Sequence, residues 1–302
     1  MCNIVVHVFS RTQALFAIAC ALEDFGHTDI EQVFILAEPA NGKITNLSLF
    51  EHALKKLGIK VSFVNELAEL QMAIGSKSIQ RIYSASTFPY RIYLKLLLSN
   101  IGIKVVNTEE GLGSYEALWH NLRYLLRQGW PLLAVRKLLA VPVFYLLKSL
   151  RVSQRKRLLK NDLSINVGLK CEILRLFHLM HGSGAAVSKE RTLCLPIDFT
   201  DVDRWVGKFP MLTFKPHPRF ADLKITEKVS PEDLDFLTAE EAVHKYGYGI
   251  IVGDHSSALV YSNILFGISA YCDLKNRWRV SDRYTLQAIK KYCDNFDETS
   301  VL

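Results

Sequence analysis

The sequence predicts an α/β protein of two domains, each built on an open parallel β-sheet. Short β-branched runs alternate with helical segments in both halves of the chain, which is typical of parallel sheets covered by helices. A run of small residues at 182–186 separates the two halves and indicates a linker. The chain has 302 residues, 49% of them hydrophobic, which is enough for two cores.

The predicted domain boundary follows this linker. Residues 1–186 would form an N-terminal domain with a basic helical insertion at about 116–181. Residues 187–302 would form a C-terminal domain. Its last helix, at about 283–295, is a candidate to pack back on the first domain.

In the first half, the first helix has a clear start. Ser10 can cap it, and Gln13 stands at its N3 position, as in a capping box. Gly58 is a stop signal for the second helix. The β-branched runs predict strands at residues 3–9, 32–36, 60–64, 81–84 and 104–107. The segments between them predict helices at residues 12–23, 47–57, 66–74 and 90–99.

In the second half, the same alternation predicts a second parallel sheet. The predicted strands are at residues 191–196, 211–214, 249–252 and 268–272. The predicted helices are at residues 239–246, 258–266 and 283–294. Ligands of such sheets bind beyond the carboxyl ends of the strands, so polar residues there are the candidates for function.

The formal charge of +7 and the pI of about 9.0 favour an anionic partner. Residues 118–160, called the basic segment below, hold no Asp or Glu but ten Lys and Arg. This segment could contact an anionic membrane, hold a polyanionic acceptor, or form a cationic helix pair with a buried apolar face. Membrane contact ranks first, and no nucleic acid is expected because no nucleic-acid motif accompanies the charge.

The six cysteines lack C-x-x-C spacing, and most lie in apolar runs, which indicates buried thiols in a reducing compartment. The apolar N-terminal run is interrupted by residues 10–13, unlike a signal peptide. The best candidate for a membrane span, residues 130–147, is interrupted by Arg136, Lys137 and Pro142. We therefore expect a cytoplasmic protein, with peripheral contact at the inner membrane face.

Glu109 and Glu110 directly follow a predicted strand. Neighbouring carboxylates repel each other, which raises the pKa of at least one and suits it to act as a general base. Gly111 and Gly113 allow a tight turn and the close approach of a ligand, with Tyr115 nearby. The alternative is a solvated acidic turn.

Lys215, Pro216, His217 and Pro218 follow another predicted strand. The two prolines restrict the backbone on both sides of His217. A fixed imidazole beside a lysine suits a phosphate leaving group, because both can supply charge-assisted hydrogen bonds. The alternative is a proline-rich turn in which His217 caps a neighbour.

Residues 253–257 lie at a strand-to-helix junction and include Asp254 and His255. Ser256 and Ser257 would open the helix, where free backbone N–H groups favour a phosphate. N-capping by serine is the alternative, and both can hold together.

Two other patterns carry less weight. Asp201 and Asp203 fit the D-x-D pattern of metal-dependent glycosyltransferases, but they lie in a segment rich in turn and cap residues. No Walker A or G-x-G-x-x-G pattern is present, which disfavours a kinase or an NAD enzyme. No metal or cofactor is expected.

The order of these motifs resembles that of bacterial sialyltransferases and polysialyltransferases that use CMP-activated nonulosonic acids. That family has a [D/E]-[D/E]-G motif, an H-P motif and a Ser/Thr-rich phosphate motif, which correspond here to Glu109-Glu110-Gly111, His217-Pro218 and Ser256-Ser257. Gln13 resembles the Gln of an N-terminal T-P-x-Q element, although the proline is replaced and Gln13 directly follows Thr12.

The resemblance implies a GT-B fold, with two Rossmann-like domains facing a cleft, and an inverting, metal-independent sialyl transfer. Glu109, Glu110 and His217 would be catalytic. The donor would be bound by Lys215, Pro216, Pro218, Asp254, His255, Ser256 and Ser257. Gln13, Gly111 and Tyr115 would lie on the acceptor side. The alternatives are a GT-B transferase for CMP-Kdo or a UDP-sugar, a non-catalytic sugar-nucleotide or polyanion-binding protein of capsule assembly, and a nucleotide-sugar epimerase.

Overall fold

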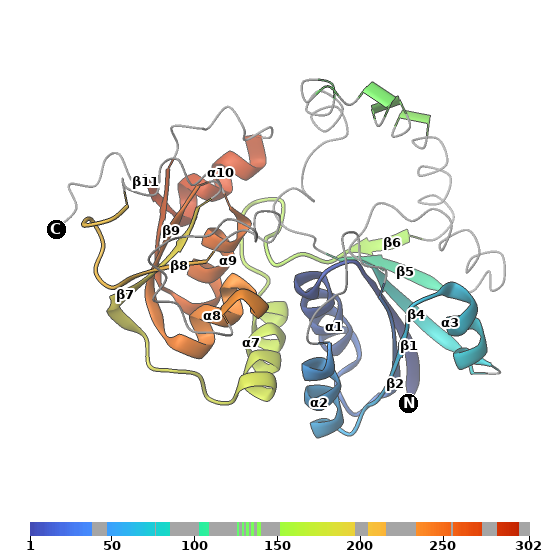
Figure 1. Ribbon diagram of the computed structural model, residues 1–302. Coiled ribbons are helices and arrows are strands. Elements are labelled where there is room, and N and C mark those ends of the chain that lie inside the picture. The colour runs from blue at the N-terminus through green and yellow to red at the C-terminus, as the bar shows by residue number, and fades with distance from the viewer. Residues whose placement is uncertain are drawn as a thin grey trace. The chain divides into compact units, whose positions relative to one another are not determined.

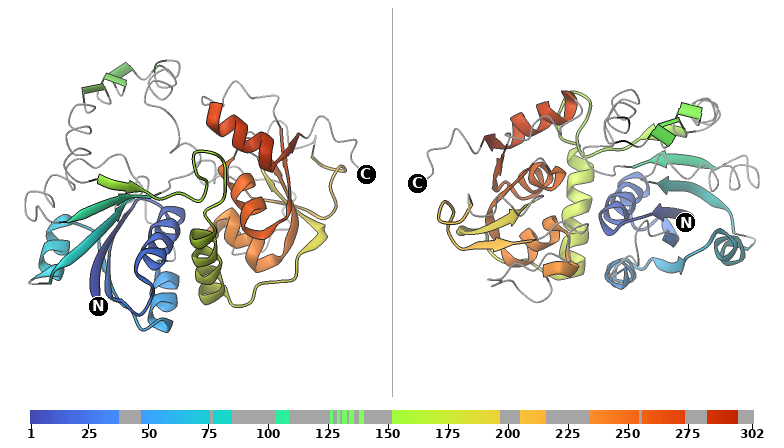
Figure 2. Two further views of the ribbon diagram at one scale, coloured as in Figure 1. Left: turned by 180° about the vertical axis from the view of Figure 1, so that it is seen from behind. Right: turned by 45° about the horizontal axis from the view of Figure 1, so that its top comes forward.

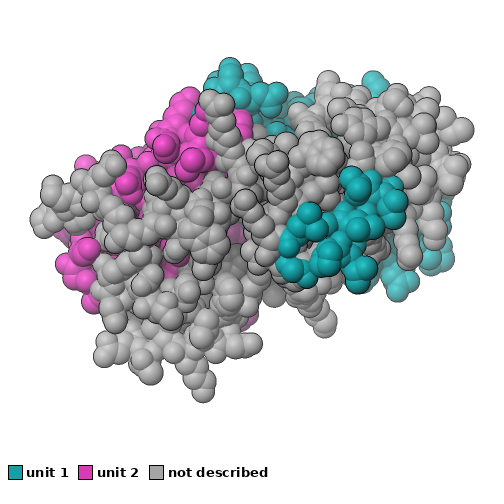
Figure 3. Space-filling view, turned by 90° about the horizontal axis from the view of Figure 1, so that it is seen from above, with its two compact units in different colours: residues 1–110, 122–180 teal, residues 111–121, 181–302 magenta. Residues whose placement is uncertain are grey.

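The chain folds as two compact units (Figures 1 and 3). Unit 1 contains Met1–Glu110 and Leu122–Met180, and unit 2 contains Gly111–Asn121 and His181–Leu302. Apart from Gly111–Asn121, unit 2 begins at His181, just before the predicted linker at 182–186. A computed structural model describes residues 1–37, 47–75, 77–84, 103–108, 126, 129, 131–132, 134–135, 138–139, 152–196, 205–215, 234–254, 256–273 and 283–295.

Unit 1 is built on a parallel sheet of six strands with the order β3-β2-β1-β4-β5-β6. The strands are β1 (Cys2–Val8), β2 (Ile30–Ala37), β3 (Lys60–Val64), β4 (Ile79–Ser84), β5 (Lys104–Asn107) and β6 (Val152–Arg155). Chain order reverses between β1 and β4, so the sheet has its topological switch point there.

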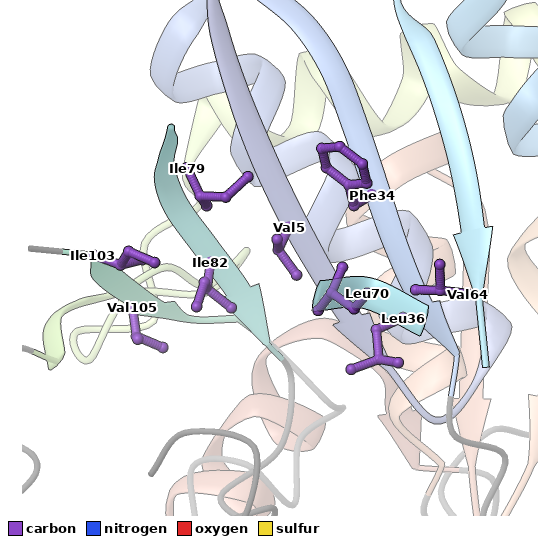
Figure 4. Packing of buried hydrophobic residues seen from close by; sticks show 9 residues of the cluster. All are labelled: Val5, Phe34, Leu36, Val64, Leu70, Ile79, Ile82, Ile103 and Val105. Atoms are coloured by element: carbon purple, nitrogen blue, oxygen red, sulfur yellow. The ribbon is translucent and has the colours of Figure 1, made fainter. Parts of the chain in front are cut away.

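Helices cover both faces of this sheet. The helices of unit 1 include α1 (Arg11–Phe25), α2 (Ser48–Lys56), α3 (Leu67–Ile74) and α7 (Val167–His181), whose last residue belongs to unit 2. Helix α1 lies on one face and α3 on the other (Figures 1 and 2). On the α3 face, Leu70 packs among strand residues such as Val5, Phe34 and Ile82 (Figure 4), so this core is built from apolar side chains.

The sixth strand lies in a stretch predicted to be helical. Val152–Arg155 pairs with β5, and the Lys156 N–H donates to the Asn107 carbonyl at 2.9 Å. The helical prediction was wrong at these four residues. The uncovered edge of β5 offers a row of backbone hydrogen-bonding groups, and pairing with them outweighs a weak local preference.

A cluster of charged side chains ties α1 to β4 and to the end of β6. Asp24 accepts hydrogen bonds from the Tyr83 hydroxyl at 2.7 Å and from Lys156 Nζ at 2.5 Å, and its carboxylate lies 2.8 Å from Arg81 Nη1. Lys156 also contacts Glu23 at 2.8 Å. Burial by itself would raise the pKa of Asp24, but the hydrogen bonds from Lys156 and Tyr83 and the two positive charges outweigh it and lower that pKa.

Unit 2 contains a second parallel sheet, with the order β11-β10-β9-β7-β8. The strands are β7 (Ser188–Leu195), β8 (Leu212–Phe214), β9 (Tyr248–Gly253), β10 (Ser269–Cys272) and β11 (Asp294–Asn295). The helices are η4 (Leu234–Phe236), α8 (Ala239–Tyr246), α9 (Ser257–Phe266) and α10 (Arg283–Tyr292). The switch point of this sheet lies between β7 and β9.

An aromatic cluster forms part of the core of unit 2. Trp205 and Phe209 pack on Ile250 and Val252 of β9, and their ring centroids are 6.2 Å apart. Helix α10 contacts α9 and β11 within the same unit. The packing of α10 on the first domain stays a prediction.

The predicted α/β class with two Rossmann-like parallel sheets is confirmed. Most predicted strands and helices are present with ends shifted by a few residues. Residues 294–295 were assigned in part to the last helix but form β11. The predicted helix at 90–99 lies outside the described residues. Among the described residues, no helix is both long and apolar enough to span a bilayer.

Candidate functional site

The C-terminal edge of the unit 2 sheet carries the third predicted motif. Strand β9 ends at Gly253, directly at the switch point, and α9 begins at Ser257. A Cβ atom on Gly253 would lie 2.6 Å from the carbonyl oxygen of Leu195 on β7. Only glycine therefore lets these two strands approach as they do.

Ser256 is the N-cap of α9, as the capping interpretation predicted. Its Oγ accepts a hydrogen bond from the Ala258 N–H at 3.2 Å, and its own N–H donates to the Asp254 carbonyl at 2.6 Å. The start of α9 is therefore fixed by local bonds at the place where parallel sheets bind phosphates. Phosphate binding by Ser256 and Ser257 stays a prediction.

Lys215 follows β8 and is directed into unit 2. Only 6% of the residue is exposed, and its Nζ donates to the Leu234 carbonyl of η4 at 2.9 Å. Burial raises the pKa of Glu240, and the positive charge of Lys215 acts in the opposite direction. In this structure the ammonium group of Lys215 is therefore bonded to η4 and lies in the interior of unit 2, near the start of α8. Its predicted role at a phosphate stays a prediction.

The start of α8 is held by a capping box. Thr238 Oγ1 accepts from the Glu241 N–H at 3.2 Å, and Glu241 Oε2 accepts from the Thr238 N–H at 2.7 Å. The other carboxylate oxygen of Glu241 lies 3.3 Å from His181 Nε2, and both side chains are buried. Both carboxylate oxygens of the buried Glu241 therefore have a partner, which offsets the cost of burying this acid.

Two buried aspartates end neighbouring strands at this edge. Asp254 follows β9 and Asp273 follows β10, with 5% and 1% exposed, and the Asp273 N–H donates to the Gly253 carbonyl at 2.9 Å. Burial, followed by the charges of these two acids, raises the pKa of Cys272 to about 12. The sequence analysis did not select Asp273. The signal was available, since it follows its strand as Asp254 follows β9.

In unit 1, buried polar residues gather at the switch point between β1 and β4. His7 Nδ1 lies 2.9 Å from Ser84 Oγ, and the residues are 1% and 0% exposed. The Thr108 N–H donates to the Ser84 carbonyl at 2.8 Å, and Thr108 is 1% exposed. Thr108 directly precedes Glu109 in the sequence, and Glu109 itself lies outside the described residues. A histidine inside the apolar run 3–9 was a signal for this site that the sequence analysis did not use.

Gln13 takes part in capping α1. Its N–H donates to Ser10 Oγ at 3.3 Å, as predicted, while its side-chain oxygen accepts from the Phe9 N–H at 2.7 Å instead of from Ser10. The residue is 4% exposed. A role toward an acceptor stays a prediction.

Several predicted site residues lie outside the described residues. They are Glu109, Glu110, Gly111, Tyr115, Pro216, His217, Pro218 and His255. Asp201 and Asp203 lie outside them as well. The structure therefore places Lys215, Asp254, Ser256 and Ser257 at one edge of the unit 2 sheet, and Gln13 at the start of α1 in unit 1. In the described part of the chain, no group of three or more His, Cys, Asp or Glu is arranged to hold a metal ion.

Three solved structures align with most of the chain at low identity. MnaA of S. aureus with UDP has 11% identity and a TM-score of 0.46, covering 90% of this chain and 79% of that one. The spinosyn rhamnosyltransferase SpnG with thymidine diphosphate has 11% identity and a TM-score of 0.45, covering 97% and 86%. UDP-GlcNAc 2-epimerase from Methanocaldococcus jannaschii has 11% identity and a TM-score of 0.43, covering 95% and 91%. No protein-family model and no curated protein matches the chain.

Proposed function

We propose that the chain is an inverting, metal-independent glycosyltransferase that moves sialic acid, or a related nonulosonic acid, from a CMP donor to a glycan acceptor. The acceptor would belong to a bacterial surface polysaccharide or lipooligosaccharide. One observation carries most of the weight: Ser256 and Ser257 open α9 at the switch point of unit 2, where α/β sheets bind phosphates. The motif order along the chain adds the sugar class.

The donor would bind to unit 2. Its phosphate would accept hydrogen bonds from the N-terminus of α9 and from His217, with the charge of Lys215 behind them. The oxygen of the acceptor hydroxyl then attacks the anomeric carbon while the bond from that carbon to the CMP oxygen breaks. CMP leaves with the bonding electron pair, and the configuration at the anomeric carbon inverts.

Glu109 or Glu110 would accept the proton that the acceptor hydroxyl loses. The backbone bond from Thr108 to Ser84 supports this proposal, because Thr108 lies at the switch point of unit 1 and directly precedes Glu109 in the sequence. His217 would stabilise the negative charge that develops on the phosphate. A phosphodiester is a good leaving group, so hydrogen bonding suffices and full proton transfer from His217 is not required.

The reaction would take place in the cytoplasm, at the inner face of the plasma membrane. Two observations support this place. The six cysteines, all within the described residues, form no disulfide with one another, which fits a reducing compartment. The basic segment has the charge needed for peripheral contact with an anionic leaflet.

The test is transfer from CMP-sialic acid to a mixture of glycan acceptors, read by the mass of the product and by CMP release. We expect His217→Ala to slow transfer by about two to three powers of ten. Glu109→Gln and Glu110→Gln should differ, with a loss of about two to four powers of ten for the one that is the base. His178→Asn and Glu66→Gln are matched controls on exposed residues and should keep the wild-type rate.

The same assay separates the alternatives. Turnover with CMP-Kdo or a UDP-sugar but not with CMP-sialic acid would assign another donor. Donor conversion without any acceptor would indicate an epimerase. If the variants at 109, 110 and 217 all retain wild-type glycan synthesis, the chain is a binding protein and the proposed mechanism is wrong.

A further inference from the structure

The described part of the basic segment exposes an unusual amount of aliphatic surface. Leu132 is 85% exposed, Val135 53%, Leu138 47% and Leu139 72%, and we call these four the aliphatic stripe. Helical backbone is described at residues 131–132, 134–135 and 138–139. Leu126, at 56% exposed, adds a further aliphatic side chain shortly before the stripe.

The spacing of the stripe is helical. Leu132, Val135 and Leu139 are separated by three and four residues, which is the spacing of side chains that share one face of a helix. Ala134 is 3% exposed, so the helix has a second side that is covered by protein. The stripe is therefore not the core face of this helix, and its exposure needs another explanation.

The charge around the stripe selects the partner. The basic segment contains no acidic residue, and Arg136 and Lys137 lie within the stripe in sequence. Lys156, near the end of the segment, is engaged with Glu23 and Asp24 in unit 1. Six of the ten Lys and Arg of the basic segment lie at residues 118–151, before, within and after the stripe in sequence.

We propose that the aliphatic stripe inserts into the surface of an anionic lipid bilayer, with the cations of residues 118–151 held at its headgroups. This deepens the proposed function, on which the assignment to the inner leaflet rests. An amphipathic helix with exposed aliphatic residues and flanking Lys and Arg binds an anionic membrane surface in two ways. Its aliphatic side chains are buried among the lipids, and its cations are attracted to the anionic headgroups. A protein partner with an acidic surface would neutralise the cations, but it would not bury the exposed aliphatic side chains.

The test is co-sedimentation of the full chain with vesicles of phosphatidylcholine alone, or of phosphatidylcholine mixed with phosphatidylglycerol. We expect binding to the anionic vesicles only, weakening as salt rises. Leu132→Ser with Leu139→Ser should weaken it by about tenfold for each leucine removed. Arg136→Gln with Lys137→Gln should weaken it by about fivefold for each charge.

The control removes equally exposed aliphatic side chains elsewhere. Met72→Ser with Val167→Ser, at 76% and 67% exposed in the wild type, should leave vesicle binding unchanged. Thermal unfolding of every variant, compared with that of wild type, separates loss of binding from loss of folding.

Three results would overturn the proposal. They are absence of binding to anionic vesicles, binding that the charge variant weakens but the leucine variant does not, and a stripe that instead mediates a dimer lost in the leucine variant. Transfer to a soluble acceptor is measured in parallel without vesicles. An active chain that binds no vesicles refutes the membrane proposal alone, whereas an inactive chain that binds them refutes the proposed transferase alone.

Discussion

Asp24 is the residue through which α1, β4 and the end of β6 are connected. Its carboxylate contacts three partners, and its side chain is only 12% exposed. If the negative charge is removed, Arg81 and Lys156 remain close together with less to neutralise them. The loss of one partner from such a cluster costs more than the interaction of a surface ion pair.

We therefore expect Asp24→Asn to lower the free energy of unfolding by about 2–3 kcal/mol at neutral pH. The midpoint of urea unfolding measures this. Asp29→Asn changes an exposed aspartate of the same unit and should stay within about 0.5 kcal/mol of wild type.

The effect of Asp24 also depends on pH in a defined direction. Its pKa is lowered in the folded protein, so its contribution is present above the unfolded pKa of about 3.9. That contribution disappears as the pH falls through the lower, folded pKa. The gap in stability between wild type and Asp24→Asn should therefore shrink below about pH 4. A gap that stays constant down to low pH would show that the charge of Asp24 is not what matters.

At the scale of elements, the N-caps of α8 and α3 differ in whether the cap side chain bonds to the helix. Thr238 starts α8 with a full capping box, whereas Glu66 starts α3 with no side-chain cap bond. The two helices have eight residues each, so they form a matched pair for measuring what a cap contributes.

We expect Thr238→Ala to lower the free energy of unfolding by about 1–2 kcal/mol, because it leaves the Glu241 N–H without its acceptor. Thr238→Ser should restore most of the loss. Glu66→Ala should cost less than about 0.5 kcal/mol. Denaturant unfolding measures all three, and an equal cost at both caps would mean that the hydroxyl of Thr238 adds nothing.

Elements with a strong local signal were predictable from sequence. Lys60–Val64, Lys104–Asn107 and Ala239–Tyr246 were predicted at their observed ends, because hydrophobic pattern and boundary residues agree there. β6 was missed because its four residues carry little pattern of their own, and only the edge of β5 makes them a strand. Strand pairing between segments that are far apart in the sequence cannot be predicted from the residues of one segment alone.

The same limit applied to the site. Positions after strands were predictable, so Lys215, Asp254 and Ser256 were found in the expected places. What Lys215 contacts was not predictable, because η4 and Glu240 reach it only through the fold. The contact between His7 and Ser84 was likewise hidden, since it joins residues that are 77 positions apart.

At the scale of the whole molecule, the two units are expected to respond differently to nucleotide. A ligand at one hundred times its Kd stabilises the state that binds it by about 2.7 kcal/mol. With CMP alone, we expect amide exchange to slow at the end of β9 and the start of α9, and to stay unchanged in β1 and β2. Hydrogen exchange measured by mass spectrometry tests this, with AMP as the control nucleotide. Protection confined to unit 1 would assign the donor to the other sheet.

The edge strand β6 has a consequence for biosynthesis. A nascent chain that has emerged only as far as residue 110 still lacks that strand, and it lacks the lysine that neutralises Glu23 and Asp24. The first sheet can thus be completed only after translation has passed residue 156 and that stretch has left the ribosome. Until then, the outer side of β5 is open to pairing with another chain, which is where a chaperone would be of most use.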